Sequence, residues 1–193
     1  MDSGDIDLWS THLPVLVAVV AKTQGPVLEL GCGHYSTRVL HALCGAQGRS
    51  GASSEPPREA QGRQLLTLDT NPGWLARFKD LESPIHRVVY TDTIAEFVRF
   101  VWTASNGASF PHGGRWSVVF EDSGIAQRRP DNIAALRAIT DLFVVNNTEP
   151  GRPVYQYERI LPSFPYRWDY KRYPVWTSVI SDSPLPDWLE RLT

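Results

Sequence analysis

The sequence of 193 residues is short of several features that mark particular protein classes. Its two cysteines, Cys32 and Cys44, form neither a zinc-binding pattern nor a disulfide framework, which favours a reducing compartment. Positive charge is not in excess, because the 19 lysines and arginines are balanced by 21 aspartates and glutamates. This balance argues against non-specific electrostatic binding of nucleic acid. The length indicates one domain over residues 1–193, and the hydrophobic fraction of 42% is that of an ordinary globular protein.

Long hydrophobic runs are also missing. The longest early run, Leu13 to Ala21, is far shorter than the ~20 residues that a membrane span needs, and acidic residues precede it where a secretory signal carries basic ones. We therefore expect a cytoplasmic protein with no membrane partner. Residues 44–64 contain no Val, Ile, Leu or aromatic residue, so they predict a flexible Gly/Ser-rich insertion within the domain.

Short apolar strands alternate with amphipathic helices along the chain. The predicted strands are 27–30, 65–68, 87–90, 116–120 and 142–145, followed by two β-rich runs at 166–173 and 175–181. The predicted helices are 11–22, a segment that begins at Ser36, 72–81, 94–102 and 131–139, with a last helical turn at 186–192. This alternation predicts a three-layer α/β/α fold around a mostly parallel sheet, closed by an antiparallel hairpin.

The first predicted strand ends in a glycine-rich turn, Gly31-Cys32-Gly33. Two glycines at a strand-to-helix junction let the backbone approach a ligand closely, and the helix that follows offers free N–H groups. Glu29 lies inside the apolar strand, and a buried carboxylate needs a hydrogen-bonding or cationic partner. That partner is a ligand, a backbone turn or a local arginine.

Acidic residues follow the other strands at the edge where a parallel α/β sheet binds its ligands. They are Asp69, Asp92, Glu121 and Asp122. A carboxylate in the position of Asp69 can accept both hydroxyls of a ribose, or it can cap the helix near Pro72. An acidic edge repels a pyrophosphate and suits a sulfonium and an ammonium group.

With these residues the chain resembles the class I S-adenosylmethionine (SAM)-dependent methyltransferases. The resemblance spans residues 11–182, and its motifs are Glu29-x-Gly31-x-Gly33, Asp69, Thr91-Asp92, Glu121-Asp122 and the terminal hairpin. It implies a Rossmann-like sheet with strand order 3-2-1-4-5-7-6 and SAM as the cofactor. A dinucleotide-binding turn is disfavoured, because position 36 is serine where that motif has its third glycine or an alanine.

The resemblance also implies a cofactor site. Glu29 would orient the motif or reach the methionine ammonium, Asp69 would bind the ribose, and Asp92 or Thr93 would lie near the adenine. The whole implied set is Glu29, Gly31, Cys32, Gly33, Ser36, Asp69, Thr70, Asp92, Thr93, Glu121 and Asp122.

Candidates for catalysis are Asp122, His34 and Tyr157, since methyl transfer needs a positioned acceptor and often a base. Asp122 ends the fourth strand, where the family contacts its substrate; the other interpretation is a turn with a helix cap. Asp122 with Asn146 and Asn147 is similar to the metal-binding set of catechol-type O-methyltransferases. An asparagine replaces the middle carboxylate of that set, so we predict no metal.

The function that we predict is methylation of a small molecule or natural-product intermediate. The alternatives are a SAM-using enzyme that transfers or cyclises the aminocarboxypropyl arm, and an inactive SAM-binding or scaffold protein. The Asn/Asp-Pro-Pro-Tyr/Phe signature of methyltransferases for amino groups on nucleic acid is absent. A homodimer is one way for so short a chain to close its active site.

Overall fold

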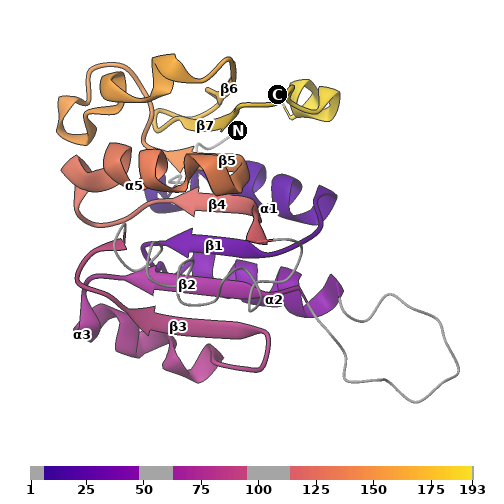
Figure 1. The fold of residues 1–193 in the computed structure, drawn as a ribbon, viewed down its shortest axis with the longest axis vertical. Coiled ribbons are helices and arrows are strands. Elements are labelled where there is room, and N and C mark those ends of the chain that lie inside the picture. The colour runs from indigo at the N-terminus through magenta and orange to yellow at the C-terminus, as the bar shows by residue number, and fades with distance from the viewer. Residues whose placement is uncertain (1–6, 48–62, 95–113, 193) are drawn as a thin grey trace, which may run out of the picture.

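The computed structural model describes residues 7–47, 63–94 and 114–192. Its strands form one sheet in the order β3-β2-β1-β4-β5-β7-β6, so the predicted strand order is confirmed (Figure 1). The strands are β1 Val27–Leu30, β2 Leu65–Asp69, β3 His86–Tyr90, β4 Trp116–Glu121, β5 Thr140–Asn146, β6 Tyr166–Tyr170 and β7 Thr177–Ser181. The first five pair in parallel, and β7 pairs antiparallel with both β5 and β6.

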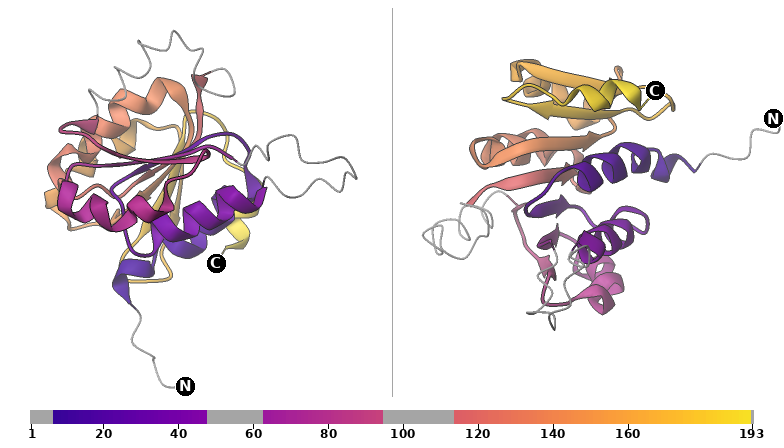
Figure 2. Two further views of the ribbon diagram at one scale, coloured as in Figure 1. Left: turned by 90° about the horizontal axis from the view of Figure 1, so that it is seen from below. Right: turned by 90° about the vertical axis from the view of Figure 1, so that its right-hand side faces the viewer.

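Helices cover both faces of this sheet. The α-helices are α1 Leu13–Lys22, α2 Ser36–Gln47, α3 Pro72–Leu75 and α5 Arg129–Leu136. The 3-10 segments are η1 Leu8–Ser10, η2 Ala76–Leu81, η4 Ala126–Arg128, η5 Arg137–Ile139, η6 Pro153–Tyr155, η7 Tyr157–Arg159, η8 Leu161–Ser163 and η9 Asp187–Arg191. Figure 2 shows α1, α2 and α3 on one face and α5 on the other. Within the described residues, no helix has the length and apolar character that a membrane span requires.

The sheet divides the apolar core into two layers. On the α1 face, Val15, Leu16, Val19 and Val20 of α1 pack with the inward side chains of β1, β4 and β5, and Leu189 of η9 completes this layer. On the opposite face, α5 and the 3-10 segments after β5 cover the alternate side chains of the same strands. The central strands are therefore buried on both faces, as their mostly apolar sequences predict.

Several predicted boundaries differ from the structure. Helix α2 continues to Gln47, past Cys44, because the Cys44 side chain is fully buried in the core and extends the apolar face of the helix. Arg63 is also buried, with its guanidinium donating to the backbone oxygens of Val20 and Thr23, so the predicted insertion is too long at both ends. The predicted helix over 72–81 divides into α3 and η2. Residues 48–62, and the predicted helix 94–102 from residue 95 onwards, lie outside the described residues.

Candidate functional site

The glycine hinge, Gly31-Cys32-Gly33, lies at the carboxyl end of β1, where the strand order turns from β2 and β3 on one side to β4 and β5 on the other. Gly31 has φ +90°, and a Cβ at this position would lie 2.5 Å from the backbone oxygen of Asp122. The two neighbouring strands hold the hinge, since Gly31 N–H donates to the oxygen of Leu68 and Asp122 N–H donates to the oxygen of Leu30. Only glycine satisfies both the backbone conformation and the close approach.

The Asp69 carboxylate, at the end of β2, reaches across to this hinge. Its Oδ2 accepts from the backbone N–H of Cys32 at 2.9 Å and from the Cys32 thiol at 3.2 Å, and its Oδ1 accepts from Asn71 N–H at 2.7 Å. Burial and this carboxylate raise the pKa of the thiol, which stays protonated. The helix-cap alternative for Asp69 is wrong, because Asn71 caps α3 by accepting from Trp74 N–H. A carboxylate has about four acceptor positions, so Asp69 retains capacity for hydroxyl donors.

Glu29 supports the hinge from behind. Its fully buried carboxylate accepts from the hydroxyl of Thr67 at 2.7 Å and from that of Thr37 at 3.1 Å. Thr37 Oγ1 in turn accepts from Gly33 N–H at 2.9 Å. Burial raises the pKa of Glu29 to about 7, although the hydroxyls of Ser36, Thr67 and Thr37 oppose this shift. The protein partners of Glu29 are therefore hydroxyls, in place of the backbone turn or arginine that the sequence suggested.

Asp122 lies at the end of β4 in contact with Arg129, at the start of α5. Arg129 Nη2 is 2.9 Å from Asp122 Oδ1, and the side chain of Asn146 also hydrogen-bonds to this carboxylate. The Arg129 side chain is 6% exposed and that of Asp122 is 25% exposed, so the pair reaches solvent only through the carboxylate. Burial raises the pKa of Asp122, and the guanidinium opposes that shift.

The Arg129 guanidinium joins the ends of β4 and β5. Its Nε donates to the oxygen of Ser123 at 2.8 Å, and its Nη1 donates to Asn147 Oδ1 and Tyr157 OH at 3.2 Å and to the Asn146 oxygen at 3.3 Å. Two oxygens of the predicted metal-binding set, Asp122 Oδ1 and Asn147 Oδ1, thus contact a resident cation, whereas the side-chain oxygen of Asn146 has no hydrogen-bond partner among the described residues. The guanidinium in this place disfavours a divalent metal, and the described residues contain no group of three His, Cys, Asp or Glu side chains that could hold one.

The three candidate catalytic residues lie in two separate parts of the site. Tyr157 shares Arg129 with Asp122; its buried hydroxyl donates to the Asn146 oxygen at 2.9 Å, and burial raises its pKa. His34 is exposed on the opposite side of the hinge, edge-on to Trp74 with ring centroids 4.9 Å apart. Asp122 and Tyr157 are therefore brought together, and His34 is not.

The remaining predicted cofactor residues differ in exposure. Glu121 is fully buried beneath α5, where it accepts from Ser123 N–H and from the amide of Asn132, and burial raises its pKa. Ser36 is buried, Thr70 and Thr93 are half-buried, and Asp92 is exposed at the end of β3. Glu121 therefore faces away from the hinge side of the sheet edge, whereas Asp92 lies on the open surface.

Sequence reasoning missed two histidines that connect to this site. His86 of β3 is fully buried, with its Nε2 3.0 Å from Thr67 Oγ1, and its Nδ1 lies 3.0 Å from Nδ1 of His41 on α2. One indication was available in the sequence: Thr37 and His41 are four residues apart and so share a face of α2. The register of β2 against β3, which places His86 near Thr67, is a property of the folded sheet.

Known proteins match this chain at the level of structure. Neither family models nor curated protein sequences give a match. The calicheamicin methyltransferase CalS11 aligns with a TM-score of 0.62 at 13% identity, over 90% of this chain and 78% of that one. The O-methyltransferase TomG from Streptomyces achromogenes, in complex with SAM, aligns with a TM-score of 0.55 at 16% identity, over 89% and 79%. The methyltransferase domain of METTL16 gives 0.55 at 11% identity, over 94% and 70%. The chain thus has the Rossmann-like fold of class I SAM-dependent methyltransferases, as the sequence predicts.

Proposed function

We propose that this chain is a SAM-dependent methyltransferase that acts on a small molecule. The observation that carries the proposal is the Asp69 carboxylate bonded across the glycine hinge at the point where the strand order reverses. Open α/β sheets bind their ligands at this point, beyond the carboxyl ends of the strands. The solved structures with this fold, including one in complex with SAM, support the same assignment.

The residues at the hinge suit SAM in chemical type. Asp69 would accept the ribose hydroxyls, the hinge backbone would line the cofactor, and Asp92 or Thr93 would lie near the adenine. The carboxylates of Asp69 and, when it is ionised, Glu29 supply negative charge near the hinge, which favours a cationic cofactor over a phosphate ester, whereas the Asp122 charge is paired with Arg129. SAM, when bound, supplies an electrophilic methyl group on a positively charged sulfur.

The protein must then hold the acceptor and take its proton. Asp122 is our candidate for the proton acceptor, because it lies at the end of β4 with part of its carboxylate exposed. Arg129 and Asn146 fix its orientation, so we assign them a positioning role. The hydroxyl of Tyr157 is hydrogen-bonded to Arg129 and to the Asn146 oxygen. We therefore assign Tyr157 a positioning role as well, in place of a catalytic one.

The small-molecule assignment draws on the named neighbours. TomG is described as an O-methyltransferase of tomaymycin synthesis, and CalS11 as a TDP-rhamnose 3'-O-methyltransferase of calicheamicin biosynthesis. We infer a comparable acceptor for this chain, a hydroxyl group on a small molecule. A homodimer stays a prediction, which light scattering would test.

Calorimetry with SAM and S-adenosylhomocysteine tests the proposal first, and absence of binding to both would contradict it. Incubation of the protein and SAM with a small-molecule extract, followed by mass spectrometry, then identifies the chemistry. S-adenosylhomocysteine as the spent cofactor indicates methyl transfer, and methylthioadenosine indicates use of the aminocarboxypropyl arm. Asp122→Asn should retain SAM binding and lose turnover; full turnover in this variant would remove Asp122 from catalysis.

A further inference from the structure

Four side chains form a continuous hydrogen-bonded chain from the surface of α2 to the back of the glycine hinge. His41 Nδ1 lies 3.0 Å from His86 Nδ1, His86 Nε2 lies 3.0 Å from Thr67 Oγ1, and Thr67 Oγ1 lies 2.7 Å from Glu29 Oε2. Glu29, Thr67 and His86 are fully buried, and His41 is half-buried at the outer end. The chain crosses β1, β2, β3 and α2, so it exists only in the folded protein.

When Glu29 is ionised, the available hydrogens allow only one tautomer each for His86 and His41. Thr67 has one hydroxyl hydrogen, and it points to the Glu29 carboxylate. His86 must then carry its hydrogen on Nε2 to donate to Thr67, which leaves Nδ1 as an acceptor. His41 must carry a hydrogen on Nδ1 to donate to His86.

The same heavy atoms accept the opposite arrangement when Glu29 is protonated on Oε2. Glu29 then donates to Thr67, Thr67 donates to His86 Nε2, and His86 donates from Nδ1 to His41. Protonation on Oε1 is less favourable. That hydrogen would point to the Thr37 hydroxyl, which already accepts from Gly33 N–H, and would leave the Thr37 hydrogen without its acceptor in a fully buried place.

A proton can leave Glu29 along this chain without any side chain moving. Glu29 passes its hydrogen to Thr67, Thr67 passes its own to His86 Nε2, and His86 passes its Nδ1 hydrogen to His41. His41 becomes an imidazolium for a moment and releases its other proton, from Nε2, to water. The net change is one proton moved from Glu29 to solvent.

We propose that His86 and His41 are positioning residues that set, through Thr67, the charge of Glu29 behind the glycine hinge, so that binding of the cationic cofactor is coupled to release of a proton at His41. This proposal rests on the proposed function. Thr37 links the two events, because it binds both Glu29 and the N–H of Gly33 in the hinge.

Among the residues that the structure describes, few other charged or titratable groups lie near the hydrogen-bonded chain. The Asp122 carboxylate from β4 faces Glu29 and raises its pKa, and the protonated thiols of Cys32 and Cys44 are close to the same carboxylate. Glu82 faces His86, together with His41. Burial lowers the pKa of His86 to about 4, so its ring stays neutral near pH 7 and can only exchange one tautomer for the other.

Nitrogen-15 NMR of histidine-labelled protein without ligand tests the proton path. Between pH 5.5 and 8.5 we expect the His86 hydrogen to move from Nδ1 to Nε2 without the ring becoming doubly protonated. Thr67→Val, which removes the hydroxyl and keeps the shape, should freeze His86 in one tautomer. Thr67→Ser should retain the exchange. An unchanging tautomer in the unsubstituted protein, or the same exchange in Thr67→Val, would overturn the path.

Calorimetry with SAM tests the coupling. If only ionised Glu29 favours the cofactor, SAM should bind about tenfold more weakly at pH 6 than at pH 8, and the pH dependence should vanish in Glu29→Gln. S-adenosylhomocysteine, whose sulfur is neutral, should show a smaller change. A pH-independent SAM affinity beside a normal tautomer exchange would overturn the coupling. No SAM binding at any pH would contradict the proposed function, and the coupling with it, while NMR still decides the proton path.

Discussion

The backbone nitrogen of Cys32 lies 2.9 Å from Oδ2 of Asp69, so the carboxylate at the end of β2 holds the turn at the end of β1 by a hydrogen bond. The residue that we propose for the ribose hydroxyls therefore also shapes the surface on which the cofactor would lie. A substitution at Asp69 therefore affects both cofactor binding and the conformation of the hinge, and experiments on this residue must measure both.

Replacement of Asp69 by alanine should weaken SAM binding by ~1.5–3 kcal/mol, or roughly 10- to 150-fold, because hydrogen bonds to a charged group are lost. Calorimetry measures the affinity, and circular dichroism checks that the fold persists. Asp80→Ala is the control, since Asp80 is exposed and pairs only loosely with Arg38 at 3.7 Å. An unchanged affinity in a folded Asp69→Ala protein would rule out the ribose assignment.

Alanine at Gly31 should destabilise the protein by about 2 kcal/mol or more, because a left-handed backbone and an overpacked contact both add cost. Gly151 is a matched control. It has a similar φ of +87°, yet a Cβ there would meet nothing within 4 Å, so Gly151→Ala should cost only ~1 kcal/mol. Chemical denaturation measures both values, and equal losses would show that the close approach to Asp122 is not tight.

The strand ends were predictable from sequence, and the contacts between them were not. Apolar runs located the five parallel strands and β-rich runs located the closing hairpin, and Asp69 and Asp122 could be placed at the carboxyl edge because parallel strands all end there. The partner of Asp122 depends on how α5 packs, and α5 begins at Arg129, two residues before the predicted start at residue 131. The three 3-10 segments between 153 and 163 were missed, since turns this short leave no apolar period in the sequence.

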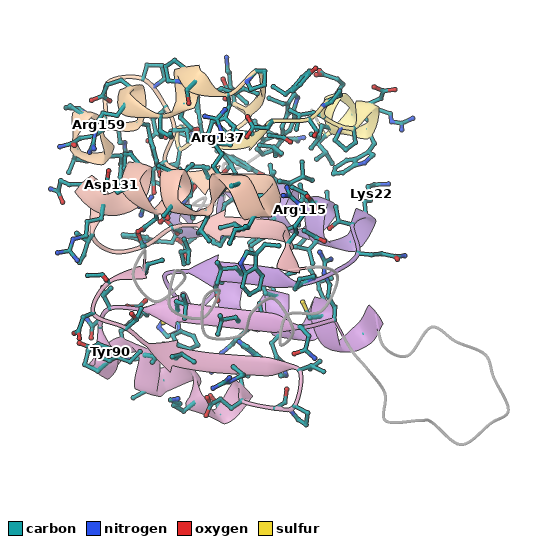
Figure 3. All side chains as sticks on the ribbon, in the orientation of Figure 1. Lys22, Tyr90, Arg115, Asp131, Arg137 and Arg159 are labelled. Atoms are coloured by element: carbon teal, nitrogen blue, oxygen red, sulfur yellow. The ribbon has the colours of Figure 1, made fainter. Side chains whose placement is uncertain are left out.

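Removal of the Arg129 charge should be costly because it leaves the Asp122 carboxylate in a buried place without its cation. We expect Arg129→Met to lower the free energy of unfolding by about 3–5 kcal/mol. Arg159→Met is the control: Arg159 and Asp131 form an exposed ion pair at 2.8 Å on the outer surface, worth ~1 kcal/mol or less (Figure 3). Similar losses in the two variants would show that Arg129 is not a structural cation.

Divalent metal should have no effect on this protein, since the Arg129 guanidinium already binds Asp122 Oδ1, Asn147 Oδ1 and the backbone oxygen of Asn146. We expect MgCl2 and EDTA to leave both SAM affinity and the melting temperature unchanged. Titration with Mn²⁺, followed by electron paramagnetic resonance, provides a direct measurement. Tight Mn²⁺ binding that disappears in Asp122→Asn would contradict this expectation.

His12 should make the protein sensitive to acid. Its ring is buried against Phe120, neither ring nitrogen has a hydrogen-bond partner among the described residues, and burial lowers its pKa to about 4. The folded state therefore disfavours the charged ring, and the free energy of unfolding should fall as the pH drops from 6.5 to 4, by up to about 3 kcal/mol. His12→Phe should make that decline shallower in denaturation measured across pH, while His86, whose pKa burial also lowers to about 4, keeps a share of it. The exposed His34→Phe change should leave the decline as it is, and an equally steep decline in His12→Phe would assign the effect elsewhere.

Leu189 of η9 lies in the same apolar layer as Val15 and Val19 of α1, and Lys22 of α1 lies over the ring of Trp188 at 5.5 Å. Segments more than 160 residues apart in the sequence thus share one layer. During synthesis, α1 emerges from the ribosome long before η9. The helix can pack against α2 and the central strands as these emerge, but final consolidation of the layer must wait for residue 189.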